Sequence, residues 1–290
     1  MHSPLSLALT LARASNLPTV WSNVLAGWLL TGQPHHAGLW LALAGGTLAY
    51  AGGCTLNDAF DAKWDRQHRP ERPIPSGAIS ERAVWRLGGS ELLLGSALLG
   101  LAGCAWPLVA ALAATILFYD WCHKRTAWAV APMGLCRVLL GWCAASMALR
   151  HGGSVGPVAG LWLAGLFAYV MGLTLVARRE AKGGGVSWPG VALALAPLAA
   201  SAAANRLAGA DLRDWLFVAF LFGLGARHVW LTLREKEDPA RIGKAVSALL
   251  AGIVAVDFLF IAQLHWHYWG LLWLALLAAS VVWQKRVAAT

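Results

Sequence analysis

The sequence is poor in charged side chains. Asp, Glu, Lys and Arg make up 13% of its 290 residues, whereas 58% of the residues are hydrophobic. Soluble domains contain about 25% charged and about 45–50% apolar residues. A water-soluble globule of this size could not bury so much apolar surface, and a disordered or fibrous chain is excluded for the same reason. The composition therefore predicts an all-α, polytopic integral membrane protein.

Acidic residues are scarcer than basic ones, with 14 Asp and Glu against 23 Lys and Arg. Tyr is also scarce, with 4 residues beside 17 Trp, whose indole rings anchor at membrane interfaces. The 5 cysteines form no CxxC pair and lie in or beside apolar runs. This pattern indicates small buried side chains, not a disulfide framework or a zinc site. The first residues lack the charged start and small-residue cleavage site of a signal peptide, so we expect none.

Ten apolar segments of near membrane-spanning length can be drawn. They run roughly over Ser15–Thr31, Ala37–Phe60, Ser80–Leu101, Trp106–Trp121, Val130–Leu149, Pro157–Ala177, Trp188–Asn205, Leu212–Leu233, Arg241–Gln263 and Tyr268–Trp283. If the N-terminus is cytoplasmic, only Arg150, Arg206 and Arg213 lie on the far side, and 20 of the 23 Lys and Arg are cytoplasmic. This bias predicts both termini on the cytoplasmic side of a bacterial inner membrane. It also accounts for the basic charge without a nucleic-acid partner.

The strongest chemical signal is a run of polar residues at the end of the second segment: Asn57, Asp58, Asp61 and Asp65. At 100° per residue these side chains share one helix face. Three carboxylates so close together repel one another at a membrane end, so we expect cations to compensate them. Clustered oxygen ligands suit Mg²⁺, which bridges carboxylates and substrate phosphates. The alternative is a solvated helix end whose acids pair with nearby Arg.

Cationic residues follow on the same predicted side of the membrane. The proline-rich loop after the acids carries Arg69 and Arg72, which it can place near a bound anion. Tyr119 is followed by Lys124 and Arg125 at the end of the fourth segment, and Lys and Arg are good phosphate partners. The plainer interpretation of both stretches is positive-inside flanking.

Other polar groups are weaker signals. Arg178, Arg179 and Glu180 close the sixth segment, where cationic flanking is again the plain interpretation. Asn16 enters the first segment beside Arg13, and its amide needs a partner once it is out of water.

Two isolated acids, Glu91 and Asp257, lie inside predicted spans. Intramembrane carboxylates are costly and usually face a cavity or a partner. A structural pair with a donor from another helix and a functional role both remain open for these two residues.

The acidic run and the following Arg69–Gly77 stretch resemble the first aspartate-rich motif of the UbiA superfamily of intramembrane prenyltransferases. The Tyr119–Arg125 stretch is similar to the family's Tyr/Lys motif, and Arg13 with Asn16 resembles its first-helix Asn motif. The second half of the chain matches by helix placement only. The resemblance implies nine to ten transmembrane helices in two four-helix-bundle halves around a central cavity. It implies one domain over 1–290, with halves at 1–126 and 127–290.

The resemblance also implies transfer of an isoprenyl group from an isoprenyl diphosphate to an aromatic or other lipophilic acceptor, with Mg²⁺ as cofactor. The residues implied to be catalytic are Asp58, Asp61, Lys124 and Glu180. The implied metal ligands are Asp58, Asp61, Asp65 and Glu180. The implied substrate-binding residues are Asn16, Asn57, Arg69, Arg72, Tyr119, Arg125, Arg178 and Arg179.

The sequence departs from the family at its second motif, normally Asp-x-x-x-Asp, where Glu180 is the single acid among basic residues. This variant and the tail after Arg241 look like the EboC-type branch, associated with metabolite biosynthesis or export operons. Three functions besides prenyl transfer stay open. They are a terpene cyclase acting on the diphosphate alone, a non-catalytic prenyl-lipid or metabolite binding or export protein, and a generic secondary transporter. The last would not need the acidic and proline-rich motifs on one face.

Overall fold

The computed structural model describes residues 3–32, 36–126, 129–180, 187–235, 240–262 and 266–285. Its described residues are almost entirely helical, which confirms the all-α class. The α-helices are α1 (Pro4–Leu11), α2 (Leu17–Leu30), α3 (His36–His68), α4 (Glu81–Ala102), α5 (Trp106–Cys122), α6 (Val130–Ser146), α7 (Pro157–Glu180), α8 (Trp188–Ala208), α9 (Leu212–Arg234), α10 (Arg241–Ile261) and α11 (Trp266–Gln284). Short 3₁₀ turns, η1 (Ala14–Asn16) and η3 (Met147–His151), precede α2 and follow α6.

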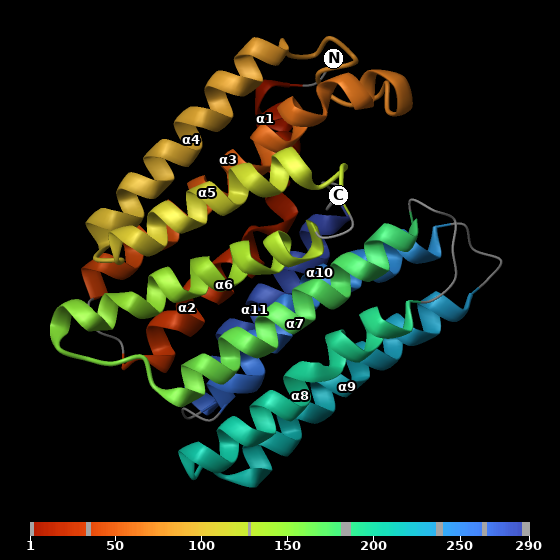
Figure 1. The fold of residues 1–290 in the computed structure, drawn as a ribbon. Coiled ribbons are helices and arrows are strands. Elements are labelled where there is room, and N and C mark those ends of the chain that lie inside the picture. Colours follow the sequence, from red (N-terminus) through yellow and green to blue (C-terminus); the bar gives the residue numbers. More distant parts are fainter. Residues whose placement is uncertain are drawn as a thin grey trace.

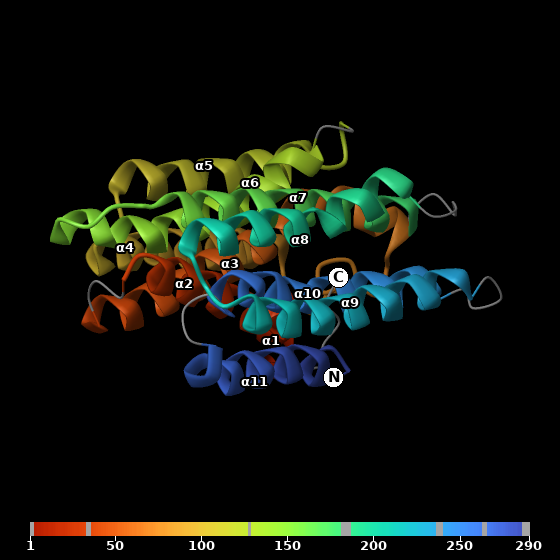
Figure 2. The same cartoon turned by 90° about the horizontal axis from the view of Figure 1, so that it is seen from below.

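From α2 onward, successive helices run back and forth across the molecule (Figure 1). As a result α3, α5, α7, α9 and α11 all end on the side where α2, α4, α6, α8 and α10 begin. The two marked chain ends lie toward this side (Figure 1). Turned by 90°, the molecule shows α11 as an outer helix next to α10 (Figure 2). The side shared by these helix ends carries every cationic motif identified in the sequence, and we call it the motif side.

Six of the described helices are long and apolar enough to cross a membrane: α3, α6 with η3, α7, α8, α9 and α10. The sequence predicted nine to ten spans. Helices α2 and α5 are only 14 and 17 residues long, and α4 has 22 residues but contains several charged side chains. These helices lie in the same bundle, and α3 with α4 forms one of its most extensive helix pairs.

Helix α3 is longer than the sequence predicted. Its 33 residues reach His68, eight beyond the expected end at Phe60. At 1.5 Å per residue it extends about 50 Å, well beyond the bilayer core of about 30 Å. Pro70 stops it, because proline cannot continue a helix and disfavours helical geometry before it. The extra turns therefore present Asp61 and Asp65 at a regular helix end on the motif side.

Glycine lets α3 and α4 pack backbone to backbone. A Cβ placed on Gly95 would lie 2.5 Å from the amide nitrogen of Ala49, closer than real Cβ atoms come. The same arrangement recurs four helices later, where a Cβ on Gly172 of α7 would lie 2.5 Å from the carbonyl oxygen of Gly190 in α8. Small residues of this kind allow close helix approach in membranes. The recurrence agrees with the two four-helix-bundle halves that the resemblance implies.

We expect Gly95→Leu to lower the thermal unfolding temperature of the detergent-purified protein, because its side chain must push α4 away from α3. Overpacking of this kind costs about 1–3 kcal/mol. Gly89→Leu is the matched control, since it lies in the same helix and a Cβ there meets nothing within 4 Å. Equal unfolding temperatures for the two variants would contradict the close contact.

Asp257 of α10 is fully buried and is held by donors from other helices. Its carboxylate accepts hydrogen bonds from Ser22 Oγ at 2.6 Å, Asn23 Nδ2 at 2.8 Å and Trp162 Nε1 at 2.8 Å. The Arg137 guanidinium of α6 donates to Asn23 Oδ1 at 3.1 Å. We call these five residues the interior network. It joins α2, α6, α7 and α10, so the interhelical donors considered for Asp257 are present.

Glu91 of α4 also accepts a hydrogen bond from a neighbouring helix, in this case within the first half. Its Oε2 accepts a hydrogen bond from Thr55 Oγ1 of α3 at 2.9 Å. Both isolated acids therefore have partners on a neighbouring helix, as expected for structural pairs.

A cavity of about 1120 Å³ lies in the second half of the chain, bounded by α7 to α11. Its lining includes no residue of the acidic motif. This cavity lies within the second half and is distinct from the central cavity that the resemblance implies between the halves.

Candidate functional site

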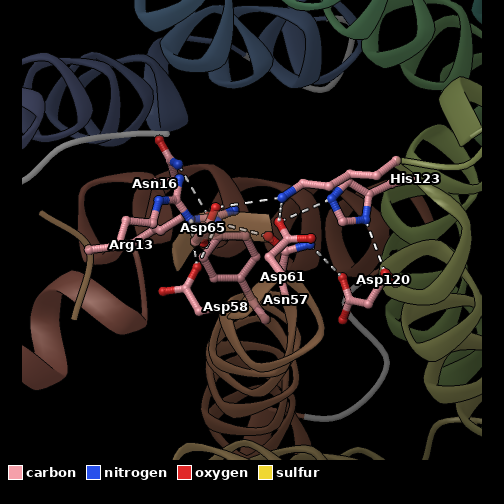
Figure 3. Close-up of polar contacts among 11 residues, drawn as sticks. Arg13, Asn16, Asn57, Asp58, Asp61, Asp65, Asp120 and His123 are labelled. Carbon is pink, nitrogen blue, oxygen red and sulfur yellow. Dashed lines mark hydrogen bonds and ion pairs between the residues drawn. The ribbon is translucent and has the colours of Figure 1, made fainter. Parts of the chain in front are cut away.

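Asp58, Asp61 and Asp65 lie together on one face of α3, as helical periodicity predicted (Figure 3). The exposed fractions of these residues are 6%, 6% and 2%, so the carboxylates are largely removed from water. The proline-rich loop helps to cover them, since Ile74 packs against Ala62 of α3 in a small apolar cluster. A buried group of three acids requires compensating charge.

Two arginines compensate the first carboxylate. Arg72 of the loop places Nη1 2.8 Å from Asp58 Oδ1 and 3.7 Å from Asp65 Oδ2. Arg13, before α2, places Nη2 3.2 Å from Asp58 Oδ1 and donates to Asn57 Oδ1 at 2.9 Å. Arg72 was predicted as an anion-binding residue of this motif, and the structure brings it to the acids.

Arg13 reaches the site through an unusual backbone conformation. Its φ of 44° and ψ of 51° are left-handed, and it is the only non-glycine residue with positive φ in the described part of the chain. This conformation costs a residue with a Cβ about 1–2 kcal/mol. The strain falls at the junction of α1 and η1, next to the ion pair with Asp58. Strained residues held by surrounding contacts cluster at functional sites.

Lys124, after α5, compensates the other two acids. Its Nζ lies 2.8 Å from Asp61 Oδ2 and 3.6 Å from Asp65 Oδ1. The ammonium also lies 3.8 Å from the centre of the Trp64 ring, a favourable cation–π position. Three carboxylates are thus matched by three permanent cations, which come from three separate segments. The alternative expectation was a solvated helix end whose acids pair with nearby Arg. Arg72 of the adjacent loop does pair with Asp58, but the acids are buried and the other two cations come from distant segments.

Asp120 and His123 also contact the acidic face of α3, and the sequence analysis assigned neither of them to the site. Asn57 Nδ2 donates to Asp120 Oδ1 at 3.0 Å, and His123 Nε2 lies 3.2 Å from Asp61 Oδ2 (Figure 3). His123 Nδ1 is 3.1 Å from the Asp120 carbonyl oxygen. The signal was present in the sequence, because Asp120 lies three and four residues before His123 and Lys124 and so shares their helix face.

Asn16 and Tyr119 border the cluster. Asn16 is buried in η1 and donates from Nδ2 to Tyr50 Oη at 3.2 Å. The Tyr119 ring stacks on His123 with centroids 5.2 Å apart. The Tyr50 ring in turn lies under the Arg137 guanidinium at 5.3 Å, so polar contacts continue from the site into the interior network.

Arg69 and Arg125 make no ion pair with the acids among the described residues, and both are exposed. The Arg69 guanidinium lies 6.0 Å from the centre of the Trp64 ring, and that of Arg125 lies 4.8 Å from the centre of Trp121. The structure therefore separates Arg125 from its neighbour Lys124, which does reach the cluster.

Arg178 of α7 reaches the backbone next to Lys124. Its Nη2 donates to the carbonyl oxygens of His123 at 3.3 Å and Thr126 at 2.9 Å, just beyond the end of α5. It thus ties the second-half motif to the first-half site. Arg179 and Glu180 end α7, and their side chains lie outside the described part of the chain.

The donor set of the site suits a metal that a phosphate helps to hold. Within the described residues, no three His, Cys, Asp or Glu side chains converge as a ready-made metal site. The cationic partners of the acids occupy carboxylate oxygens instead. Mg²⁺ at phosphate sites needs only one or two carboxylates, with waters and substrate oxygens completing its octahedron. Asp58 and Asp61 meet that requirement, with Asp65 beside them.

The site lies in the part of the chain that is similar to known proteins. Residues 16–189 match the model of the UbiA prenyltransferase family, a stretch that includes the acidic motif, Lys124 and Arg178. A digeranylgeranylglyceryl phosphate synthase from Ignicoccus hospitalis is 40% identical over 112 residues, which cover 38% of this chain and 36% of that protein. The chain therefore spans about a third of the length of that relative.

Solved structures show the same fold. A UbiA homologue from Aeropyrum pernix, in its apo form, superposes with a TM-score of 0.64 at 18% identity, covering 87% of this chain and 98% of that one. A UbiA homologue from Archaeoglobus fulgidus bound to GPP and Mg²⁺ gives 0.53 at 16% identity, covering 95% and 98%. The resemblance predicted from the motifs is confirmed: with more than half of its length matching the family model, this chain belongs to the UbiA prenyltransferase family.

Proposed function

We propose that this protein is a Mg²⁺-dependent intramembrane prenyltransferase that transfers an isoprenyl group from an isoprenyl diphosphate to a lipophilic acceptor. The observation that carries the proposal is the buried cluster in which Asp58, Asp61 and Asp65 are matched by three cations. A cluster of this kind can bind a metal and a diphosphate together. The carboxylates can bind the metal ion, and the cations can bind the phosphate oxygens.

In this proposal the cations exchange partners when substrate binds. Lys124 Nζ and the Arg72 guanidinium turn from carboxylate to phosphate oxygens, which they bind equally well. Asp58 and Asp61, supported by Asp65, would then hold Mg²⁺, which when bound supplies charge neutralisation of the pyrophosphate. Asn57 keeps its hydrogen bonds to Arg13 and Asp120, and these hold the acidic face of α3 in place relative to α5.

The chemical step breaks the allylic C–O bond, and pyrophosphate leaves with the electron pair. Lys124 and Arg72 stabilise the charge that develops on it. The acceptor forms a new bond to the allylic carbon and releases a proton. With exposed fractions of 6% or less for the three acids, little water lies at the reacting end to quench the cation.

A second candidate is a non-catalytic protein that binds a prenylated lipid or metabolite. Two observations favour it. The acids are already charge-balanced within the chain, and the sequence carries the single acid Glu180 where the family has a second acidic pair. Such a protein would bind the diphosphate but release no pyrophosphate.

The deciding experiment incubates the detergent-purified protein with Mg²⁺ and isoprenyl diphosphates of short and long chains. Acceptors are an isoprenyl glycerophosphate, as the name of the Ignicoccus relative suggests, and an aromatic acid. We expect pyrophosphate release and a prenylated product by mass spectrometry with one acceptor, both abolished by EDTA. Product from the diphosphate alone would indicate a cyclase, and binding without pyrophosphate release would establish the second candidate.

We propose that the motif side of the bundle faces the cytoplasm and that 1–290 acts as one transmembrane domain with halves 1–126 and 127–290. The interior network supports the second point, since Asp257 contacts Ser22 and Asn23 across the two halves. The distribution of Lys and Arg supports the first.

We expect Ser76→Cys and Ser154→Cys to be labelled from opposite sides of sealed membranes by an impermeant maleimide. Both positions are exposed, and they lie on opposite ends of the bundle. Four of the five native cysteines are buried, and the unsubstituted protein measures the background. Labelling of both new cysteines from the outside would refute the orientation.

We also propose that Glu180 contributes to the diphosphate site from the second half. We expect Glu180→Gln to reduce diphosphate binding or turnover at least tenfold, about 1.4 kcal/mol. An interfacial acid without such a role would contribute only about 0–1 kcal/mol. Glu235→Gln, at an exposed helix end on the same side, is the control. Equal activity of the two variants would remove Glu180 from the site.

A further inference from the structure

The cavity between α7 and α11 has features of a second binding site. Its volume of about 1120 Å³ exceeds the range of about 300–1,000 Å³ typical of small-molecule pockets. None of its lining residues belongs to the acidic cluster or contacts it. Its use therefore needs an explanation separate from the diphosphate site.

The cavity is cationic at the motif side. Arg227, Lys244 and Lys285 line it there, and its described lining residues include no carboxylate. Arg227 and Lys285 are exposed and make no ion pair within the described part of the chain. This contrasts with the acidic cluster, where each cation has a carboxylate within reach. Several cations that line one cavity without a carboxylate beside them attract an anion.

A hydrogen-bond donor lies beside these cations. Gln284, the last residue of α11, lines the cavity, and its Nε2 is buried without a hydrogen-bond partner among the described residues. Buried amide nitrogens almost always have an acceptor. An anionic oxygen held by Arg227 and Lys285 at the same end of the cavity would supply one.

Away from the cations the lining of the cavity is mostly apolar and extends inward along the helices. Trp188 and Trp230 lie against each other at its motif-side end, with ring centroids 5.4 Å apart, as Trp does at membrane interfaces. Phe222 and Tyr169 line its inner part, and Phe222 lies about 18 Å from the end of α9 at 1.5 Å per residue. A ligand of matching chemistry has an anionic head and an extended hydrocarbon chain.

We propose that this cavity binds an anionic phospholipid of the surrounding membrane, with its phosphate at Arg227, Lys244, Lys285 and Gln284 and an acyl chain along the inner wall. The occupant follows from charge complementarity and from the apolar lining that continues inward from the cations to Phe222 and Tyr169. Lys and Arg near the headgroup favour anionic over zwitterionic lipids. The site is independent of the proposed prenyl transfer, because it shares no residue with the acidic cluster.

The test measures lipid affinities by native mass spectrometry, with phosphatidylglycerol and phosphatidylcholine of identical acyl chains. We expect the unsubstituted protein to prefer phosphatidylglycerol by about tenfold or more. In the double variant Arg227→Gln with Lys285→Gln the preference should fall close to parity, while phosphatidylcholine affinity stays the same. The matched control, Arg206→Gln with Arg213→Gln, removes two exposed cations at the other end of α8 and α9 and should keep the preference.

Two further measurements test where the acyl chain binds and whether the headgroup alone is enough for binding. Ala248→Phe fills the apolar part of the cavity and should weaken both lipids to a similar extent. Excess glycerol 1-phosphate should fail to displace phosphatidylglycerol, since it lacks the chain. The proposal is overturned if the unsubstituted protein shows no preference, if the double variant keeps it, if Ala248→Phe changes nothing, or if free glycerol 1-phosphate competes. Asp61→Ala should leave all these affinities unchanged, which separates this site from the diphosphate site.

Discussion

Asp61→Ala is expected to weaken Mg²⁺-dependent binding of isoprenyl diphosphate at least a hundredfold, about 2.7 kcal/mol. Asp61 is the meeting point of Lys124 at 2.8 Å and His123 at 3.2 Å, so its loss removes a proposed metal ligand and releases both partners. The fold should survive, because Asp61 lies in the last two turns of α3, beyond the interior network. Equilibrium binding of the diphosphate with and without Mg²⁺ measures the effect.

Asp61→Asn and Glu81→Gln are the controls for this result. Asp61→Asn keeps the shape and removes the charge, and it should lose the Mg²⁺ dependence as Asp61→Ala does. Glu81 pairs with Arg66 at 2.6 Å on the same side of the bundle, but both side chains are substantially exposed, at 40% and 52%. Such a pair contributes about 0–1 kcal/mol, so Glu81→Gln should bind normally. Full diphosphate affinity of Asp61→Ala in Mg²⁺ would show that the metal assignment is wrong.

The acidic face could be predicted from the sequence because helical periodicity is local. Asp58, Asp61 and Asp65 needed only a continuous helix to share a face, and α3 provides it. The identity of their cationic partners depends on tertiary structure. The residue pattern alone does not distinguish Lys124 from Arg125, although the family resemblance gave them different roles. Among the described residues, Lys124 contacts the acids and Arg125 contacts Trp121, because the chain leaves α5 in a turn that directs adjacent side chains apart.

The contact partner of Arg13 could not be predicted from the sequence either. Its resemblance to a first-helix motif suggested that it matters, but its partner Asp58 is 45 residues away. The left-handed conformation that directs Arg13 toward Asp58 is unusual for a residue with a Cβ, so propensity gives no indication of it. Asp120 was visible within a recognised motif, but its contact with Asn57 depends on how α5 packs against α3.

For the fold, helices α2 to α11 and their order followed from the apolar runs, whereas α1, the ends of the helices and the position of the large cavity did not. The expected end of α3 at Phe60 followed hydropathy, but polar residues continue a helix when one of its faces is buried, as it is for Asp61 and Asp65. The cavity is bounded by α7 to α11, whereas α10 packs against both α2 and α7. Asp257 contributes to that packing through donors from α2 and α7, which the sequence does not identify.

Asp257→Leu is expected to destabilise the protein by about 3–5 kcal/mol, the cost of removing one partner from a buried charged group. The substitution leaves the donors Ser22, Asn23 and Trp162 without their acceptor. It also leaves the cation of Arg137, which is 7% exposed, without a buried counter-charge. Thermal unfolding in detergent should show a large fall in transition temperature. Asp257→Asn keeps an acceptor at the same place and should lose less.

The interior network also predicts that Arg137 and Asp257 are energetically coupled, which a double variant tests. Arg137→Met alone should also destabilise, because Asn23 and Thr19 lose the donor that reaches them at 3.1 and 2.9 Å. If Asn23 transmits the interaction between Arg137 and Asp257, the double variant Arg137→Met with Asp257→Leu should be more stable than the sum of the single effects predicts. Residues in one hydrogen-bonded network couple by about 0.5–3 kcal/mol, whereas separate sites add. The exposed Arg213→Met is the control for loss of a cation and should leave the transition unchanged. Strict additivity would mean that the two charges stabilise the helix packing independently and that Asn23 does not link them.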